Sequence, residues 1–159
     1  MPGRAVHQFT QLIYHPVFLS AFFSWFVAQL LKAIINIASG KGRSSKDILL
    51  TFFWATGGMP SSHSCMVTAL ATSIGFIEGV SSPLFIAMLC YGLLTIRDAL
   101  GVRRAAGTQA RAINYLTSQL SARLSIPPHP VKEIHGHTMA EVSVGVILGF
   151  FIAVAFCSL

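Results

Sequence analysis

The sequence predicts an all-α integral membrane protein, a helical bundle with about four long transmembrane helices plus a short re-entrant or interfacial helix. Of the 159 residues, 53% are hydrophobic and only 10% are charged, whereas soluble domains carry roughly 25% charged residues. Several apolar runs are long enough to cross a hydrocarbon layer of roughly 30 Å. We expect one membrane domain over residues 1–159.

The first expected span covers residues 17–38 and follows a polar leader over residues 1–16. Lys32 lies near the end of this span, where a long side chain extends its charge to the interface. We expect this arrangement rather than a buried functional charge. Residues 48–56 are apolar but too short to cross, so they predict the re-entrant or interfacial helix.

Two further long helices are expected over residues 61–79 and 84–102, joined by a short Ser-Ser-Pro turn at 81–83. Residues 103–130 then predict an extramembrane amphipathic helix and a proline-rich linker. The last span covers residues 137–159.

Basic residues are concentrated in the segments expected on one side of the membrane. The 11 Lys and Arg residues outnumber the five Asp and Glu residues, which gives a formal charge of +6. If residues 48–56 do not cross, the positive-inside rule places residues 39–60 and 97–137 on the same side. The starts of the second and fourth spans and the end of the third then share one membrane face. We expect no nucleic-acid partner, because no aromatic platform is interleaved with the basic residues.

The cysteines give no sign of disulfide or metal chemistry. Cys65, Cys90 and Cys157 lie in apolar stretches without a CxxC pair, so we expect small buried side chains and neither a metal nor a cofactor. No cleavable signal is evident, and the membrane of the mitochondrion, the plastid or the endoplasmic reticulum stays open.

Residues 57–64, GGMPSSHS, gather polar residues at the expected membrane edge. Free N–H groups in the first turn of a helix, with the positive end of its dipole, form a ready anion site. The hydroxyls of Ser61 and Ser62 add donors. A break followed by ordinary helix-start residues, with His63 as an interfacial side chain, explains the stretch equally well.

A second polar cluster opens the last span. His137 and Glu141 are four residues apart, so on a helix they share one face. A carboxylate bonded to one imidazole nitrogen fixes the tautomer and raises the basicity of the other nitrogen, as a nucleophilic or metal-binding histidine needs. The alternatives are a salt bridge or a helix-start carboxylate that serves the helix dipole. We favour a functional pair, because it lies at the expected level of His63.

A third cluster follows the third span. Arg103 and Arg104 are suited to clamping a phosphate. Positive-inside anchoring explains the arginines equally well, but it does not explain Asp98 beside Arg97.

These residues resemble the divergent branch of the type 2 phosphatidic acid phosphatase and vanadium haloperoxidase superfamily. Residues 60–63, Pro-Ser-Ser-His, are similar to its Pro-Ser-Gly-His motif, and His137-x-x-x-Glu141 is similar to its His-x-x-x-Asp motif. The resemblance covers roughly residues 25–155. It implies a phosphate site at one membrane face, with His137 as the nucleophile that forms a phosphohistidine, Glu141 as its orienting carboxylate and His63 as the general acid. The phosphate ligands carried over or suggested by position are Ser61, Ser62, Arg97, Arg103, Arg104 and Lys132.

The chain departs from the family pattern at several positions. It has no Arg-Pro pair and so lacks the first family motif. Ser62 replaces a glycine and Glu141 replaces an aspartate. Val131 stands where an arginine is expected, with Lys132 beside it.

Two functions therefore stay open. One is a membrane phosphatase acting on a lipid or isoprenoid phosphate; the other is a non-catalytic subunit of a larger membrane complex that retains the fold. Membrane lipids are expected partners in both cases.

Overall fold

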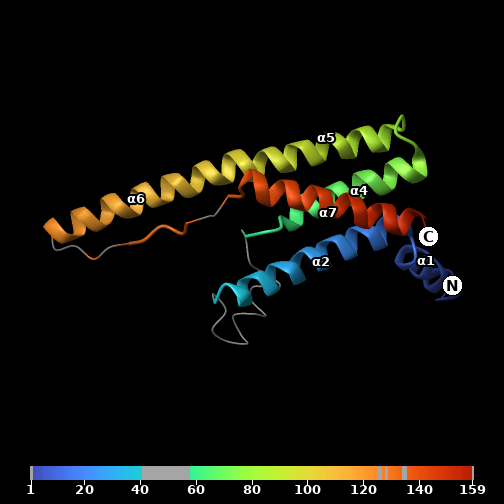
Figure 1. The fold of residues 1–159 in the computed structure, drawn as a ribbon, viewed down its shortest axis with the longest axis horizontal. Coiled ribbons are helices and arrows are strands. Elements are labelled where there is room, and N and C mark those ends of the chain that lie inside the picture. The colour runs from blue at the N-terminus through green and yellow to red at the C-terminus, as the bar shows by residue number, and fades with distance from the viewer. Residues whose placement is uncertain (1, 41–57, 125–126, 128, 134–135, 159) are drawn as a thin grey trace.

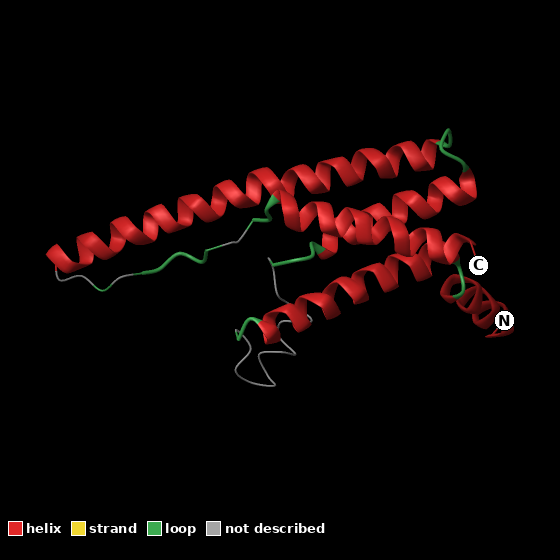
Figure 2. Cartoon of the chain, in the orientation of Figure 1, coloured by secondary structure: helices red, strands yellow, loops and turns green. Residues whose placement is uncertain are grey.

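The computed structural model describes residues 2–40, 58–124, 127, 129–133 and 136–158. The expected helix at 48–56 lies outside these residues. The described part is helical and contains no strand (Figures 1 and 2). Its elements are α1 (Pro2–Ile13), α2 (Pro16–Ala38), α4 (Ser62–Glu78), α5 (Pro83–Arg97), the π-helix η1 (Asp98–Val102), α6 (Arg103–Leu124) and α7 (Met139–Ser158). The all-α class predicted from the sequence is confirmed.

Three helical stretches of the described chain are long and apolar enough to cross a membrane. They are Pro16–Ala38, the continuous stretch Pro83–Leu124, and Met139–Ser158. Helix α4 has 17 residues and is therefore roughly 26 Å long. It lies among the other helices, with α2, α5 and α7 packed against it. The chain is a helical membrane bundle.

The starts of α4 and α5 follow ordinary helix-capping chemistry. The hydroxyl of Ser61 accepts a hydrogen bond from the N–H of Ser64, and the hydroxyl of Ser82 accepts one from the N–H of Phe85. Pro83 occupies the first turn of α5, where its missing N–H costs nothing. These caps explain why both helices begin within one residue of the predicted positions.

Helix α7 packs against the start of α4 through two glycines. A Cβ atom at Gly149 would lie 2.1 Å from the carbonyl oxygen of Cys65, and one at Gly145 would lie 2.5 Å from that of Ser61. Small residues four apart let two membrane helices approach to backbone contact. This contact fixes the start of α7 beside the start of α4.

The interface between α2 and α4 is polar. Ser20 and Ser73 share a hydrogen bond between their buried hydroxyls, and Cys65 donates through its Sγ to the carbonyl oxygen of Ser24 at 3.2 Å. Cys65 is buried, as predicted, but Cys90 is exposed on α5. The prediction of a buried cysteine fails at Cys90 because none of the described helices covers its side of α5.

Helices α5, η1 and α6 form one nearly straight rod, and α6 extends beyond the bundle (Figure 1). Residues 129–133 return along α6, where Asn114 holds them. The N–H of Val131 donates to Asn114 Oδ1 at 2.7 Å, and Asn114 Nδ2 donates to the carbonyl oxygen of Val131 at 2.9 Å and to Glu133 Oε1 at 3.0 Å. That residues 103–130 lie outside the membrane stays a prediction.

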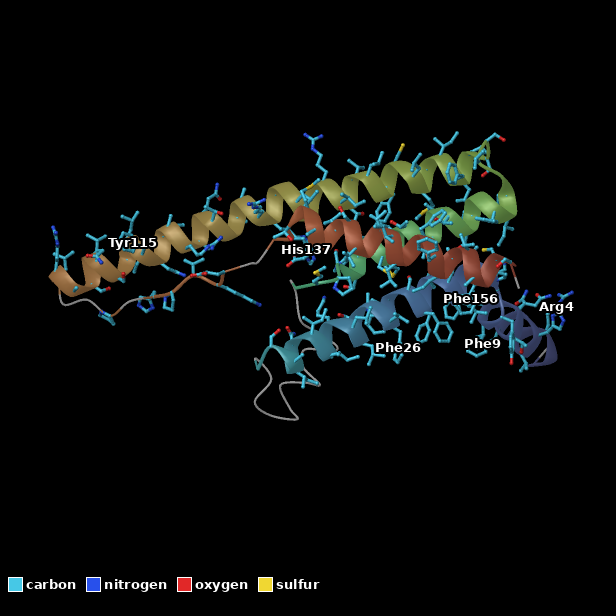
Figure 3. All side chains as sticks on the ribbon, viewed as in Figure 1. Arg4, Phe9, Phe26, Tyr115, His137 and Phe156 are labelled. Carbon is cyan, nitrogen blue, oxygen red and sulfur yellow. The ribbon has the colours of Figure 1, made fainter. Side chains whose placement is uncertain are left out.

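Helix α1 lies at the other end of the molecule from α6, as the labels on Arg4 and Phe9 show (Figure 3). Because α1 covers residues 2–13, the predicted polar leader is helical over most of its length. Val6, Phe9 and Leu12 are exposed along it at a spacing of three residues, which gives α1 an apolar stripe.

Candidate functional site

The candidate site lies at the end of the bundle where α4 and α7 begin and α5 ends (Figure 1). Two backbone hydrogen bonds join these helix ends. The N–H of Ser61 donates to the carbonyl oxygen of Glu141 at 3.0 Å, and the N–H of His137 donates to that of Ala99 at 3.1 Å. The polar clusters predicted to share one membrane face thus meet at one end of the bundle.

His137 and Glu141 form the best-defined pair of this site. Nδ1 of His137 lies 3.0 Å from Oε2 of Glu141, and His137 is only 7% exposed. Figure 3 shows His137 where the chain reaches the start of α7 below the rod. Helix α7 begins at Met139, so the pair does not share a helix face as predicted. It forms because the turn before the helix folds the imidazole back over the carboxylate.

A capping box holds Glu141 in place. Its Oε2 accepts the N–H of Thr138 at 3.0 Å, and the Thr138 hydroxyl accepts the N–H of Glu141 at 3.3 Å. Glu141 therefore caps its own helix and also contacts His137. A functional role for the pair stays a prediction.

This geometry sets the chemistry of the imidazole. A carboxylate at Nδ1 keeps the proton on that nitrogen, and the lone pair of Nε2 is then available to an electrophile or a metal. The described residues contain no group of three or more His, Cys, Asp or Glu side chains that could hold a metal ion. That the protein uses no metal stays a prediction.

His63 is exposed in the first turn of α4. The side chains whose charges act on its ring are Arg103, His137, Lys32 and Asp98. His63 and His137 are thus close enough for their charges to interact, although His63 lies on α4 and His137 lies in the turn before α7.

Ser61 and Ser62 are both buried, at 0% and 5% exposure. The Ser61 hydroxyl accepts from the N–H and from the hydroxyl of Ser64, so it is engaged within the first turn of α4. Phosphate binding by these two hydroxyls stays a prediction.

Arg103 is paired with Asp98, with 2.6 Å between Nε and Oδ2. The pairing spans the π-helix, so the partner of Asp98 is Arg103 and not its neighbour Arg97. Arg97 and Arg104 are exposed. A Cβ atom at Gly136 would lie 2.5 Å from the Cα of Arg104, so only glycine lets the segment before His137 pass this close to α6.

Lys132 lies away from the site among the described residues. Its neighbours Val131 and Glu133 are bound to Asn114, which is roughly 15 Å further along α6 than Arg104 at 1.5 Å per residue. A phosphate role for Lys132, like those for Arg97 and Arg104, stays a prediction.

Lys32 corrects the sequence analysis. It is only 2% exposed and does not extend to the interface as predicted. Its charge acts on both Glu141 and His63, and its stem lies 3.7 Å from where a Cβ of Gly58 would be. Lys32 is buried because it lies on the side of α2 that faces the starts of α4 and α7.

A signal for this burial was present in the sequence. Small residues recur every four positions before Lys32, at Ser20, Ser24 and Ala28, and all three are buried. A stripe of small residues marks the packed face of a membrane helix, and Lys32 continues it. Gln29 is also buried, and its Oε1 has no hydrogen-bond partner among the described residues.

The chain is thus a helical membrane bundle whose helix ends gather a carboxylate-bound histidine, a second histidine and a buried lysine. The sequence model of the divergent PAP2 family matches residues 13–152, and the chain belongs to this family. The predicted family membership is confirmed.

One relative extends this result. The uncharacterized membrane protein YuiD of Bacillus subtilis (strain 168) is 33% identical to the chain over 145 residues, which cover 84% of this chain and 89% of YuiD. No solved structure matches the chain.

Proposed function

We propose that the protein is a membrane phosphatase that hydrolyses a lipid or isoprenoid phosphate through a phosphohistidine. The observation that carries this proposal is the buried His137 imidazole, whose Nδ1 lies 3.0 Å from Glu141. This arrangement presents Nε2 as the nucleophile, and nucleophilic histidines need such a partner to fix their tautomer.

The reaction proceeds in two steps. Nε2 of His137 attacks phosphorus, the bond from phosphorus to the alcohol oxygen breaks, and His63 gives its proton to that oxygen. Water then attacks phosphorus and passes a proton to His63 as the P–N bond breaks. Inorganic phosphate leaves, and both histidines return to their starting states.

Cations around the two histidines offset the charge that develops on the phosphoryl oxygens. Lys32 is the buried cation of this group, and Arg103 adds a positive charge that Asp98 partly offsets. The N–H groups of Ser62 and His63, in the first turn of α4, supply further donors. Lys32 thus compensates in part for the family motif that the sequence lacks.

The test is phosphate release from labelled phosphatidic acid and labelled polyprenyl phosphate by the purified protein. We expect release by the wild type, loss of release in His137→Ala, and a 10- to 100-fold reduction in Glu141→Gln. His129→Ala is the matched control, because His129 is exposed and lies outside the site. An acid-labile phosphorylated protein should accumulate in the wild type and be absent from His137→Ala. Equal release by the wild type and His137→Ala would contradict the proposal.

The second candidate function is a non-catalytic subunit of a larger membrane complex. The observation that favours it is the apolar face of α6, where Ile113, Leu116, Leu120 and Leu124 are exposed on one side of the helix. No phosphate release from any substrate, together with stable co-purification of partner subunits from the native membrane, would favour this candidate. Loss of those subunits in Leu116→Ser would locate their contact on α6.

A further inference from the structure

An apolar groove runs along α4 and α5, starting near the candidate site. It consists of two adjoining cavities of about 270 Å³ and about 500 Å³. Thr72 and Phe85 line both cavities, so the two adjoin at these residues. The wall of the groove is otherwise apolar apart from Thr68.

The near end of this groove adjoins the polar cluster. Ile96 lines the groove and immediately precedes Arg97 and Asp98. Val67 lines it from α4, one helical turn beyond His63 and on the same face of that helix. The groove therefore begins where the charged side chains end.

The length of the first cavity matches one leaflet of a bilayer. Between Phe85 and Ile96, α5 rises roughly 16 Å at 1.5 Å per residue, about half of a hydrocarbon core that is roughly 30 Å thick. The second cavity continues from Phe85 to Val80, at the turn between α4 and α5.

Small residues make room for the groove. Gly92 lines it and is buried, and a Cβ there would meet Val67 only at 3.8 Å, an ordinary contact distance. Gly75 lies under the ring of Phe85, where a Cβ would come within 2.9 Å of the ring. The Phe85 ring thus rests on Gly75 at the junction of the two cavities.

We propose that this groove holds the hydrocarbon chain of a phosphorylated lipid whose phosphate lies at His137. The proposal rests on the proposed function for the position of the phosphate. A chain lying along α4 and α5 enters sideways from the bilayer. Its head group then lies toward His63 and His137, because Val67 and Ile96 at the near end of the groove are close in the chain to His63 and Asp98. Chains long enough to pass Phe85 gain the contacts of the second cavity, so chain length governs affinity.

The test uses phosphatidic acid that carries a photoreactive diazirine in its acyl chain, with the full-length protein in phosphatidylcholine vesicles. We expect labelling, mapped by mass spectrometry, to concentrate on the groove residues of α4 and α5, and unlabelled phosphatidic acid to compete better than added phosphatidylcholine. Gly92→Leu fills the first cavity and should reduce this labelling at least tenfold. Gly92→Ala is the matched control, because its Cβ fits.

A second variant keeps the test informative if Gly92→Leu does not fold. Ala71→Leu narrows the same cavity from α4 and should reduce labelling in the same way. Uniform labelling around the bundle would contradict the proposal that the groove holds the lipid chain. Unchanged labelling in both leucine variants, once they are shown to be folded, would contradict it as well.

The groove and the catalysis can fail separately. His137→Ala should keep the labelled groove while losing phosphate release. If the wild type labels in the groove but releases no phosphate, only the proposed phosphatase activity is contradicted. If phosphate is released and groove labelling is undiminished in Gly92→Leu and Ala71→Leu, only the proposed lipid-binding groove is contradicted.

Discussion

The bundle and the α6 arm bury different kinds of side chain. The described bundle buries Lys32, Ser24 and His137, whereas the buried residues of α6 are Gly107 and Ala110. Large apolar side chains are exposed on both, such as Leu94 at 65% on α5 and Leu116 at 60% on the arm. Ionisable groups inside a membrane bundle are costly and are retained where they act. Buried charge therefore distinguishes the candidate-site end of the bundle from the arm.

The two regions are also held together differently. Backbone contact at Gly145 and Gly149 fixes α7 on α4, whereas residues 131–133, in the described part of the returning chain, are hydrogen-bonded to the side chain of Asn114. We expect substitutions in the bundle to affect the whole fold and substitutions on the arm to act locally.

The largest effect is expected for Gly149→Leu. Even the Cβ would lie 2.1 Å from a backbone oxygen of α4, so the helices must separate, at a cost above about 3 kcal/mol. Thermal unfolding in detergent, followed by circular dichroism, measures this loss. Gly101→Ala is the control, because no atom lies within 4 Å of the position of its Cβ. An unfolding temperature that differs little between the two variants would show that this contact does not hold the bundle.

A smaller effect is expected for Lys32→Met, which keeps the bulk of the side chain and removes its charge. A hydrogen bond to a charged group contributes about 1.5–3 kcal/mol, so inorganic phosphate should bind at least tenfold more weakly, as measured by calorimetry. Lys132→Met removes the same charge from an exposed position near Asn114 and should change binding little. Equal weakening in the two variants would mean that the charge acts through the general field and not at the site.

The smallest effect is expected for Asn114→Ala. Three hydrogen bonds hold residues 131–133 to α6, and their loss costs about 1–3 kcal/mol locally. Amide exchange at Val131 should become faster while the unfolding temperature of the bundle stays the same. Gln119→Ala, at another exposed position of α6, is the control. A lower unfolding temperature in Asn114→Ala would show that the arm also stabilises the bundle.

The sequence predicted those features that depend on local chemistry. Ser61 and Ser82 mark helix starts because their hydroxyls cap the next turn, and the spacing of His137 and Glu141 identifies a pair that the structure joins. The same local chemistry contained a capping box at Thr138 and Glu141 that the interpretation of a shared helix face overlooked.

Features that depend on which helix face is covered were harder to predict. A hydropathy scale gives every lysine the same value, whether it is buried or faces outward. The burial of Lys32 therefore becomes evident only from the packing of α4 and α7 on that side of α2. The burial predicted for Cys90 is wrong for the opposite reason, because none of the described helices packs on its side of α5. The position of Lys132 depends on the return of the chain along α6, which Asn114 fixes from 17 residues away.

The hydrogen bond from the N–H of Ser61 to the carbonyl oxygen of Glu141 has a consequence for biosynthesis. Residues 61 and 141 lie far apart in the chain, so the start of α4 has no partner from α7 while the chain is being made. The catalytic arrangement we propose then comes into being only after α7 has entered the bilayer and docked on its glycines. A nascent chain that has inserted α2, α4 and α5 already carries Lys32 and His63, but it is inert until that last helix arrives.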